Sequence, residues 1–178
     1  MNNQFSEEKT IWFTSDTHFN HTNIINYCNR PFVFDGTPNV QSMNQALIEH
    51  WNANVSSSDV IYHLGDFSFG TKKQASDILH MLNGYKVLIK GNHDRSLSSM
   101  KEIGFDLVFK TLIFDDAILG RILLTHQPTL DDSVDFIFCG HVHTKWKRKN
   151  KHINVGVDVW NLEPVSLKTL RVFCKPES

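Results

Sequence analysis

Five short motifs rich in Asp, Asn and His carry side chains that could hold metal ions. Their donor atoms are oxygens and nitrogens, and no cysteine is among them. Mixed donors of this kind suit Mn²⁺, Fe, Zn²⁺ or Ni²⁺ better than Ca²⁺ or Mg²⁺. In chain order the motifs are Asp16-Thr17-His18, Gly65-Asp66, Gly91-Asn92-His93-Asp94, Thr125-His126 and Gly140-His141-Val142-His143.

The spacing of these donors predicts a hydrolytic centre with two metal ions. Two ions about 3.5–4 Å apart need one ligand that binds both, and a carboxylate does this with its two oxygens. Asp66, a lone carboxylate at the end of an apolar run, is the candidate for that ligand. Asp16 and His18 are two positions apart, which lets both enter one pocket from a strand end. The remaining donors are Asn92, His126, and the pair His141 and His143, which repeats the spacing of the first motif.

Most of the motifs directly follow a short run of apolar residues. Such a run, bounded by turn residues, is typical of a buried strand, and open sheets bind ligands at the carboxyl ends of their strands. Gly65, Gly91 and Gly140 each precede a donor, where glycine allows a turn that a Cβ atom would obstruct. The apolar runs are residues 11–13, 60–64, 87–89, 122–124 and 136–138.

The rest of the chain predicts the elements that position these motifs. In the first part we expect strands at 11–15, 60–64 and 86–90, and helices at 23–28, 41–54, 72–82 (capped by Thr71) and 95–103. In the second part we expect strands at 108–117, 121–125, 136–139, 146–149, 152–155 and 170–174. Alternating units followed by a run of strands predict an α/β protein, a four-layer α/β/β/α sandwich.

Length and composition fit one domain over residues 1–178, with a net charge of -1 that gives no overall field toward nucleic acid or anionic lipid. No stretch approaches the roughly 18 apolar residues that cross a bilayer, so no membrane partner is expected. The first nine residues lack the basic start and apolar core of a signal peptide, which predicts a cytoplasmic protein. The odd number and wide spacing of the cysteines predict reduced, buried thiols at Cys28, Cys139 and Cys174.

The set of motifs resembles that of the calcineurin-like metallophosphoesterase superfamily. The order Asp-x-His, Gly-Asp, Gly-Asn-His-Asp, His and Gly-His-x-His spans residues 16–143, and no part of the pattern is missing. Segments 14–21, 30–32 and 154–160 are similar to a branch of small, cap-less phosphoesterases of bacteria and phages. The chain has no insertion long enough to form a cap, so we expect an open site.

The resemblance implies two metal ions and their ligands. Mn²⁺ is the expected ion, with Fe, Zn²⁺ or Ni²⁺ as alternatives. A hydroxide between the ions would attack phosphorus in line, without a covalent phosphoenzyme. One ion would be held by Asp16, His18, Asp66 and His143, and the second by Asp66, Asn92, His126 and His141.

The resemblance also implies two catalytic residues beside the metals. His93 would lie near the leaving oxygen, as a general acid or as a donor to the phosphoryl group. Asp94 would accept a hydrogen bond from the His93 ring and fix its orientation. The alternative for His93 is support of the site without contact to the substrate.

Further residues near the motifs could contact the substrate. Asn92 could do so in addition to binding metal, and Arg95 could bind phosphate or simply begin a solvated helix. His21 and Arg30 lie in the loop region after the first motif, where a role at the site and a structural role are both open. We expect Asp158 to accept a hydrogen bond from the site loops rather than to bind metal.

The segment 145–152 is the only dense basic run in the sequence. It could bind a nucleic-acid backbone, with Trp146 stacked on a base. It could equally be a hairpin with a solvated cationic tip, which the near-neutral net charge favours.

Three functions stay open. The intact donor set favours a hydrolase of small phosphodiesters, including cyclic nucleotides, or of phosphomonoesters, with a phosphate ester or nucleotide as its partner. A nuclease acting on RNA or DNA is the alternative, and a non-catalytic interaction module on the same fold is a third. The sequence indicates no oligomeric state.

Overall fold

The computed structural model of the protein describes residues 9–175, which form two facing five-stranded sheets. Residues 1–8, most of the segment in which no signal peptide is expected, lie outside the described residues. The first sheet has the order β12-β1-β4-β5-β6, and all its strands are parallel except β12. Its strands are β1 (Ile11–Thr14), β4 (Val60–His63), β5 (Tyr85–Ile89), β6 (Leu107–Phe109) and β12 (Val165–Ser166).

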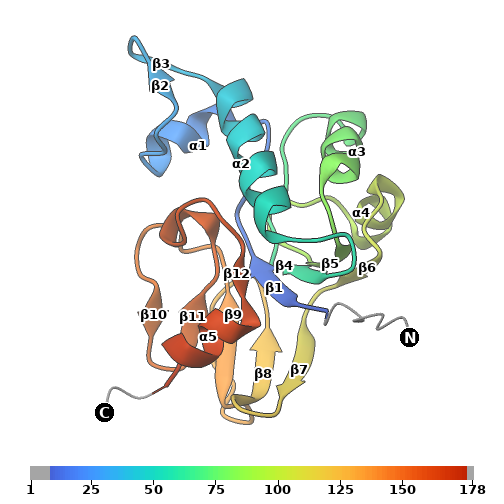
Figure 1. The fold of residues 1–178 in the computed structure, drawn as a ribbon, viewed down its shortest axis with the longest axis vertical. Helices are drawn as coiled ribbons and strands as arrows, with labels where there is room; N and C mark the ends of the chain where they lie inside the picture. The colour runs from blue at the N-terminus through green and yellow to red at the C-terminus, as the bar shows by residue number, and fades with distance from the viewer. Residues whose placement is uncertain (1–8, 176–178) are drawn as a thin grey trace, which may run out of the picture.

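Helices cover the outer face of the first sheet because its strands alternate their apolar side chains between two cores. Ile61 and Leu88 belong to the core beneath the helices, whereas their neighbours Tyr62 and Ile89 belong to the core between the sheets. Figure 1 shows the covering helices on the side away from β7, β8 and β9. They are α2 (Val40–Asn54), α3 (Lys72–Met81) and α4 (Leu97–Ile103). The predicted N-cap of α3, Thr71, is confirmed and forms a capping box with Gln74.

The second sheet has the order β10-β11-β9-β8-β7. Its three central strands are parallel, and the two edge strands are antiparallel to their neighbours. Phe138 from this sheet packs edge-on against Phe13 of β1, with ring centroids 5.2 Å apart, in the core between the sheets. The strands are β7 (Leu112–Asp116), β8 (Gly120–Leu124), β9 (Phe136–Cys139), β10 (Arg148–Lys149) and β11 (His152–Asn154).

The outer layers of the sandwich are unequal. Three helices cover the first sheet, whereas the described chain after β6 has one α-helix, α5 (Leu167–Phe173), whose Leu167 and Leu170 enter the core between the sheets. The outer face of the second sheet carries a small cluster of Leu123, Ile137 and the loop residue Val134. The predicted α/β sandwich of the metallophosphoesterase type is confirmed, but α5 packs against β1 and β12 and into the core between the sheets, not on the outer face of the second sheet.

Smaller elements lie outside the two sheets. The helix α1 (Thr22–Tyr27), expected from the sequence, leads to an unpredicted hairpin of β2 (Val33–Phe34) and β3 (Thr37–Pro38), the blue arm of Figure 1. A single 3-10 turn, η1 (Val157–Val159), carries Asp158. None of the described helices is long and apolar enough to cross a bilayer. The three cysteines are free and buried, as expected.

The single strand predicted over 108–117 is wrong. The structure has two strands there, and they belong to different sheets: β6 pairs parallel with β5, and β7 pairs antiparallel with β8. The chain crosses between the sheets at Lys110 and Thr111. Because an apolar, strand-like pattern continues on both sides of this crossing, the local pattern does not reveal it.

The strand predicted at 170–174 is also wrong, because these residues lie in and just after the helix α5. Leu167, Leu170 and Cys174 are buried at helical spacing, and the Ser166 hydroxyl caps the helix by accepting a hydrogen bond from the Thr169 N–H. The β-forming composition of the segment is overridden by this burial pattern. The strand expected at 146–149 is reduced to the two residues of β10.

Candidate metal centre

The loops that follow β1, β4, β5, β8 and β9 meet at one edge of the sandwich. Backbone hydrogen bonds join them: the Asp16 N–H donates to the Gly65 carbonyl and the Gly140 N–H to the His126 carbonyl, each at 3.0 Å. All five motifs lie in these loops, so the fold brings the seven predicted donors to one place. They form two groups around Asp66.

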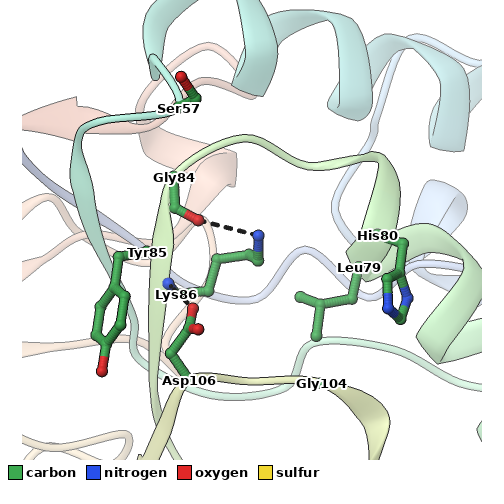
Figure 2. Close-up of a pocket in the computed structure, with 8 residues that line it drawn as sticks. All are labelled: Ser57, Leu79, His80, Gly84, Tyr85, Lys86, Gly104 and Asp106. Carbon is green, nitrogen blue, oxygen red and sulfur yellow. Dashed lines mark hydrogen bonds between the residues drawn. The ribbon is translucent and has the colours of Figure 1, made fainter.

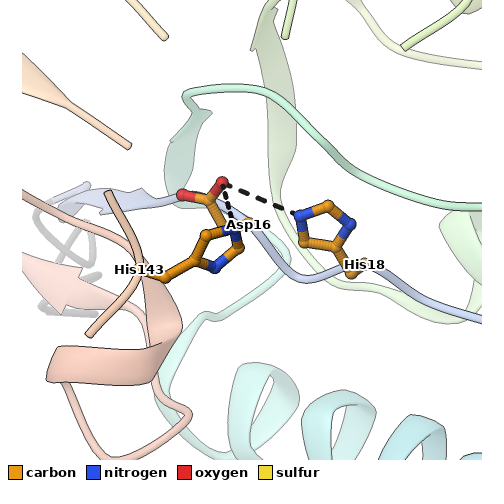
Figure 3. Close-up of side chains that lie close together, drawn as sticks. All are labelled: Asp16, His18 and His143. Atoms are coloured by element: carbon orange, nitrogen blue, oxygen red, sulfur yellow. Dashed lines mark ion pairs between the residues drawn. The ribbon is translucent and has the colours of Figure 1, made fainter. Parts of the chain in front are cut away.

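The first donor set, Asp16, His18 and His143, is grouped around one carboxylate oxygen. The Nε2 atoms of His18 and His143 lie 3.9 and 4.0 Å from Asp16 Oδ1. Figure 3 shows both rings directed at the Asp16 carboxylate. His18 Nε2 also lies 3.7 Å from Asp66 Oδ2. Two donors about 2.1 Å from one ion are at most about 4.2 Å apart, so these separations fit a shared ion.

The second donor set, Asn92, His126 and His141, lies on the other side of Asp66. His126 Nε2 is 3.3 Å from Asp66 Oδ2 and 2.9 Å from Asn92 Oδ1. His141 Nδ1 is 3.1 Å from the same Asn92 oxygen. Asp66 therefore faces both sets with the same oxygen, Oδ2, and not with its two oxygens as expected, because Oδ1 accepts a hydrogen bond from the His93 backbone N–H.

Buried atoms without partners show that the first donor set fits a cation. Both ring nitrogens of His18 are buried and have no hydrogen-bond partner among the described residues. Burial lowers the pKa of His18 to about 2, so its ring is neutral and offers a free lone pair. Burial also raises the pKa of the Asp16 carboxyl, a cost that a bound cation would offset.

The second donor set also fits a cation, because of the tautomer that His126 adopts. Its Nδ1 lies 2.7 Å from the Leu64 carbonyl, which can only accept, so Nδ1 carries the proton. In the neutral ring, Nε2 then presents a lone pair toward the oxygens of Asn92 and Asp66. Burial lowers the pKa of His126, but the hydrogen bond to the Asp66 carboxylate outweighs burial, so the pKa is raised overall. The position of this ring therefore favours positive charge.

The buried ion pair of Arg30 and Asp158 lies next to His143. Its Nδ1 donates to Asp158 Oδ2 at 2.8 Å, which leaves Nε2 for the first donor set. Burial opposes ionisation of Asp158, but the hydrogen bond from His143 and the charge of Arg30 lower its pKa to about 2. In the same way, Asp158 raises the pKa of His143 to about 10 against the effect of burial. Asp158 thus orients the His143 ring, in line with the hydrogen-bonding role expected for it.

Of the two roles left open for Arg30, the structure supports the structural one. Its side chain is buried, and its five N–H groups are directed at Asp158, at the carbonyls of Asp16 and Thr17, and at the sulfur of Met43. The two carbonyls belong to the first motif. Arg30 therefore positions the loop that carries Asp16 and His18.

Most of the predicted donors have a strained backbone conformation. Five of the seven have a positive φ, between 48° and 68°, which is uncommon for residues with a Cβ atom. Such a conformation costs on the order of 1 kcal/mol or more per residue and clusters at functional sites. The surrounding hydrogen bonds must therefore hold these donors in place. The five are Asp16, His18, Asp66, His141 and His143.

Glycines permit this close assembly for two different reasons. Gly65 has φ +96°, and a Cβ atom there would lie 2.5 Å from the Gly91 nitrogen, so both the turn and the space require glycine. Gly140 has no positive φ, but a Cβ atom would lie 2.4 Å from Asp16 Oδ2. At Gly140 the reason is close packing and not the turn that the sequence predicts.

The predicted hydrogen bond between Asp94 and the His93 ring is absent from the structure. The buried Asp94 carboxylate accepts instead from the backbone N–H groups of Gly91, Asp66 and Phe67, at 2.8 to 2.9 Å. It therefore ties the loop after β5 to the loop after β4. Both Asp94 oxygens are thus taken by backbone N–H groups and not by the imidazole of His93.

His93 lies beside the first donor set, on an exposed wall of the site. Its backbone N–H donates to Asp66 Oδ1 at 2.8 Å, and its ring centroid is 5.8 Å from that of His18. Phe69 packs between His93 and His21, with centroids at 5.2 and 3.9 Å. His21 is thus near the site, whereas the guanidinium of Arg95 donates to the Gly70 carbonyl at its margin.

Two lysines that the sequence analysis missed border the second donor set. A cavity of about 280 Å³ is lined by Lys90, Asn92, Lys110 and His126, among others. Lys110 follows β6, which runs parallel to β5, so it reaches the same edge of the sheet as the donors. The prediction of one strand over 108–117 concealed this position. The basic residue at the end of an apolar run was the available signal.

A separate cavity of about 280 Å³ lies at the start of β5, away from the donors. Figure 2 shows the Lys86 amine donating to the Gly84 carbonyl and the Lys86 backbone N–H donating to Asp106. Burial lowers the pKa of Lys86. None of the predicted site residues lines this cavity.

Comparisons with known proteins agree with the fold and the motifs. The sequence profile of the calcineurin-like phosphoesterase family matches residues 9–145. An uncharacterized protein of Methanocaldococcus jannaschii is 39% identical over 171 residues, covering 89% of this chain and 88% of its own. The gene 66 protein of Mycobacterium phage D29 is 27% identical over 185 residues, covering 85% and 89%. A crystal structure of a protein of unknown function from Aquifex aeolicus is similar with a TM-score of 0.72 and 29% identity, over 93% of this chain and 100% of that chain.

The fold and the site together define a class of metal-dependent hydrolases, and the profile match over most of the chain identifies which one. This chain belongs to the calcineurin-like phosphoesterase family. It is therefore, in general terms, a metal-dependent hydrolase of phosphate esters. The high coverage of both relatives, one of them from a phage, agrees with the small branch of the family.

Proposed function

We propose that the protein hydrolyses small phosphodiesters or phosphomonoesters, cyclic nucleotides among the diesters, with two divalent metal ions. The position of Asp66 carries this proposal. One of its oxygens lies 3.7 Å from His18 Nε2 and 3.3 Å from His126 Nε2, between two groups of donors. A structural ion would need only one such group.

The proposed ligands follow the two donor sets, each completed by Asp66. When bound, two such ions polarise the phosphoryl oxygens and generate a nucleophile from water near neutral pH. Asp158 and the Leu64 carbonyl accept hydrogen bonds from Nδ1 of His143 and His126, which leaves Nε2 of each ring to bind a metal ion in place of its proton. Mn²⁺ is the proposed ion, and Fe, Zn²⁺ or Ni²⁺ fit the same mixture of nitrogen and oxygen donors.

His93 is the proposed donor of a proton or hydrogen bond to the leaving oxygen. Its ring is exposed at the mouth of the site, while its backbone N–H is anchored to Asp66. This arrangement keeps the imidazole near the metals without making it a ligand. Asp94 contributes by fixing the backbone on both sides of Asp66, and not by orienting the imidazole.

The alternative of a nuclease requires a basic groove that extends from the site. Within the run 145–152, however, Lys147, Arg148 and Lys151 are engaged with other parts of the protein. This favours a small substrate. A non-catalytic module is disfavoured because all seven donors converge.

Turnover by metal-stripped protein supplied with Mn²⁺ tests the proposal. Bis-p-nitrophenyl phosphate and p-nitrophenyl phosphate should be compared, with Zn²⁺, Ni²⁺ and Fe²⁺ in parallel. We expect hydrolysis that needs added metal and saturates near two ions per chain. Faster diester turnover would define a phosphodiesterase, and faster monoester turnover a phosphatase. If two ions bind and neither ester reacts, the proposal is wrong and the non-catalytic module takes its place.

A further inference from the structure

A second cavity lies next to the metal centre and has a different character. Its volume is about 440 Å³, within the range of small-molecule sites. One wall is a loop after β8, and the other is the hairpin of β10 and β11 with the residues before it. The lining includes Pro128, Leu130, Val142, Lys145, Trp146 and Lys149.

The cavity adjoins the metal donors through both of its walls. Val142 stands between His141 and His143, so its Cα is about 3.8 Å from the Cα atoms of both. Pro128 follows His126 by two positions. The Lys145 backbone N–H donates to the Val142 carbonyl at 3.0 Å, so Lys145 follows directly on the turn that carries His141 and His143.

The basic run divides into engaged and free cations. Lys147 lies 3.5 Å above the ring of Trp160, the Arg148 guanidinium donates to the Phe173 carbonyl, and Lys151 donates to the Val134 carbonyl. Within residues 9–175, Lys145 and Lys149 are exposed and form no ion pair or side-chain hydrogen bond. The two free cations are also the two that line the cavity.

The walls of the cavity are held in place independently of any ligand. His152 Nε2 donates to the Thr129 carbonyl at 2.6 Å, and Lys151 anchors the same loop at Asp131 and Val134. Trp146 is half-buried, and its backbone carbonyl accepts a hydrogen bond from Asn154. An indole in a fixed wall, with Leu130 and Val142 nearby, offers a flat apolar surface.

We propose that this cavity binds the base of a nucleoside phosphate whose phosphate lies at the metal centre. The inference rests on the function proposed above and names the substrate class. A nucleobase stacks on an indole, and the free ammonium groups of Lys145 and Lys149 attract an anionic ligand toward this side of the site. The volume and the presence of only two free cations fit one nucleotide rather than a polymer.

Two diesters with the same leaving group test this inference. Thymidine 5′-(p-nitrophenyl phosphate) and methyl p-nitrophenyl phosphate differ only in the group that would enter the cavity. We expect kcat/KM to be about 10-fold higher for the thymidine ester, from stacking of its base. Trp146→Ala should remove this preference, and Trp146→Phe should retain most of it. Lys145→Gln with Lys149→Gln should raise KM for the thymidine ester, whereas the remote Lys168→Gln should not.

The outcomes separate this inference from the proposed function. If both esters react equally well, or if Trp146→Ala keeps the preference, the inference is overturned while the phosphoesterase stands. If neither diester reacts and p-nitrophenyl phosphate is inert as well, the proposed function fails, and calorimetric binding of thymidine 5′-monophosphate to wild type and Trp146→Ala decides the inference. Weaker binding by about 10-fold in the variant would support it, and equal binding would overturn it.

Binding of a ten-residue oligothymidylate over 100-fold tighter than the mononucleotide, with steep salt dependence, would overturn the assignment to a single nucleotide.

Discussion

The two donor sets use the same kinds of side chain but differ in their surroundings. In the first set Asp16 and His18 are 0% and 2% exposed, and the ion pair of Arg30 and Asp158 stands behind the ligands. In the second set Asn92 and His141 are exposed, and Asn92 and the buried His126 line a cavity together with two lysines. We therefore expect the first set to retain an ion and the second set to admit a substrate.

This difference has a physical basis in preorganisation. Ligands whose rotamers are held by buried partners lose little freedom when an ion binds, whereas exposed ligands must be ordered. We therefore expect the first donor set to bind its ion more tightly. The exposed set leaves more room for exchangeable ligands such as a phosphoryl oxygen. Four variants test this comparison, in order of expected effect.

Asp66→Asn should affect both sets equally, because both share its carboxylate. Replacing a charged oxygen by an amide removes the bridging charge, so turnover should fall by about 1000-fold or more and both ions should be bound more weakly. Metal content by mass spectrometry and kcat on a p-nitrophenyl ester measure this. Retention of two tightly bound ions would show that Asp66 is not the shared ligand.

His93→Ala should affect catalysis without affecting either donor set. Loss of a proton donor to the leaving oxygen should lower kcat by about 100-fold. Both ions should remain, because the contact to Asp66 comes from the backbone N–H. Metal content and kcat should be measured on the same preparation. A loss of half the metal would assign His93 to the ligands instead.

Asp158→Asn should separate the two sets. Without the carboxylate that orients His143, affinity for the ion of the first set should fall by about 10- to 100-fold, while that of the second set stays the same. Stepwise titration of metal-stripped protein with Mn²⁺ resolves the two steps, and Asp115→Asn, at an exposed position, is the control. Equal weakening of both binding steps would contradict the expected difference between the first donor set, which has buried partners, and the second, which is exposed.

Lys110→Gln should have the smallest effect, and this effect should be limited to substrate binding at the second donor set. An exposed ammonium beside the second set contributes a screened attraction, so KM should rise only a few-fold, and more at low ionic strength. Steady-state kinetics at two salt concentrations measure this, with Lys168→Gln as a matched lysine outside the cavity. An unchanged KM at both salt concentrations would remove Lys110 from the binding surface.

The sequence predicts the first half of the fold better than the second. Residues 11–104 alternate strands and helices with clear periodicity and end signals, such as Thr71 before α3 and Gly104 after α4, and the structure confirms them. In the second half, short apolar segments fit a strand or a helix equally well. The crossing at Lys110 and the helix α5 both depend on contacts with distant residues.

The sequence by itself determined the chemical types of the donors, their positions at strand ends, and the family to which the chain belongs. Local signals suffice for these features because each motif is contiguous and each strand ends where its apolar run ends. Only the tertiary structure decided that Asp94 holds backbone N–H groups, that Arg30 is buried behind the first set, and which lysines stay free. Such roles depend on which partners lie within hydrogen-bond reach, often more than 100 positions away, as Arg30 and Asp158 show.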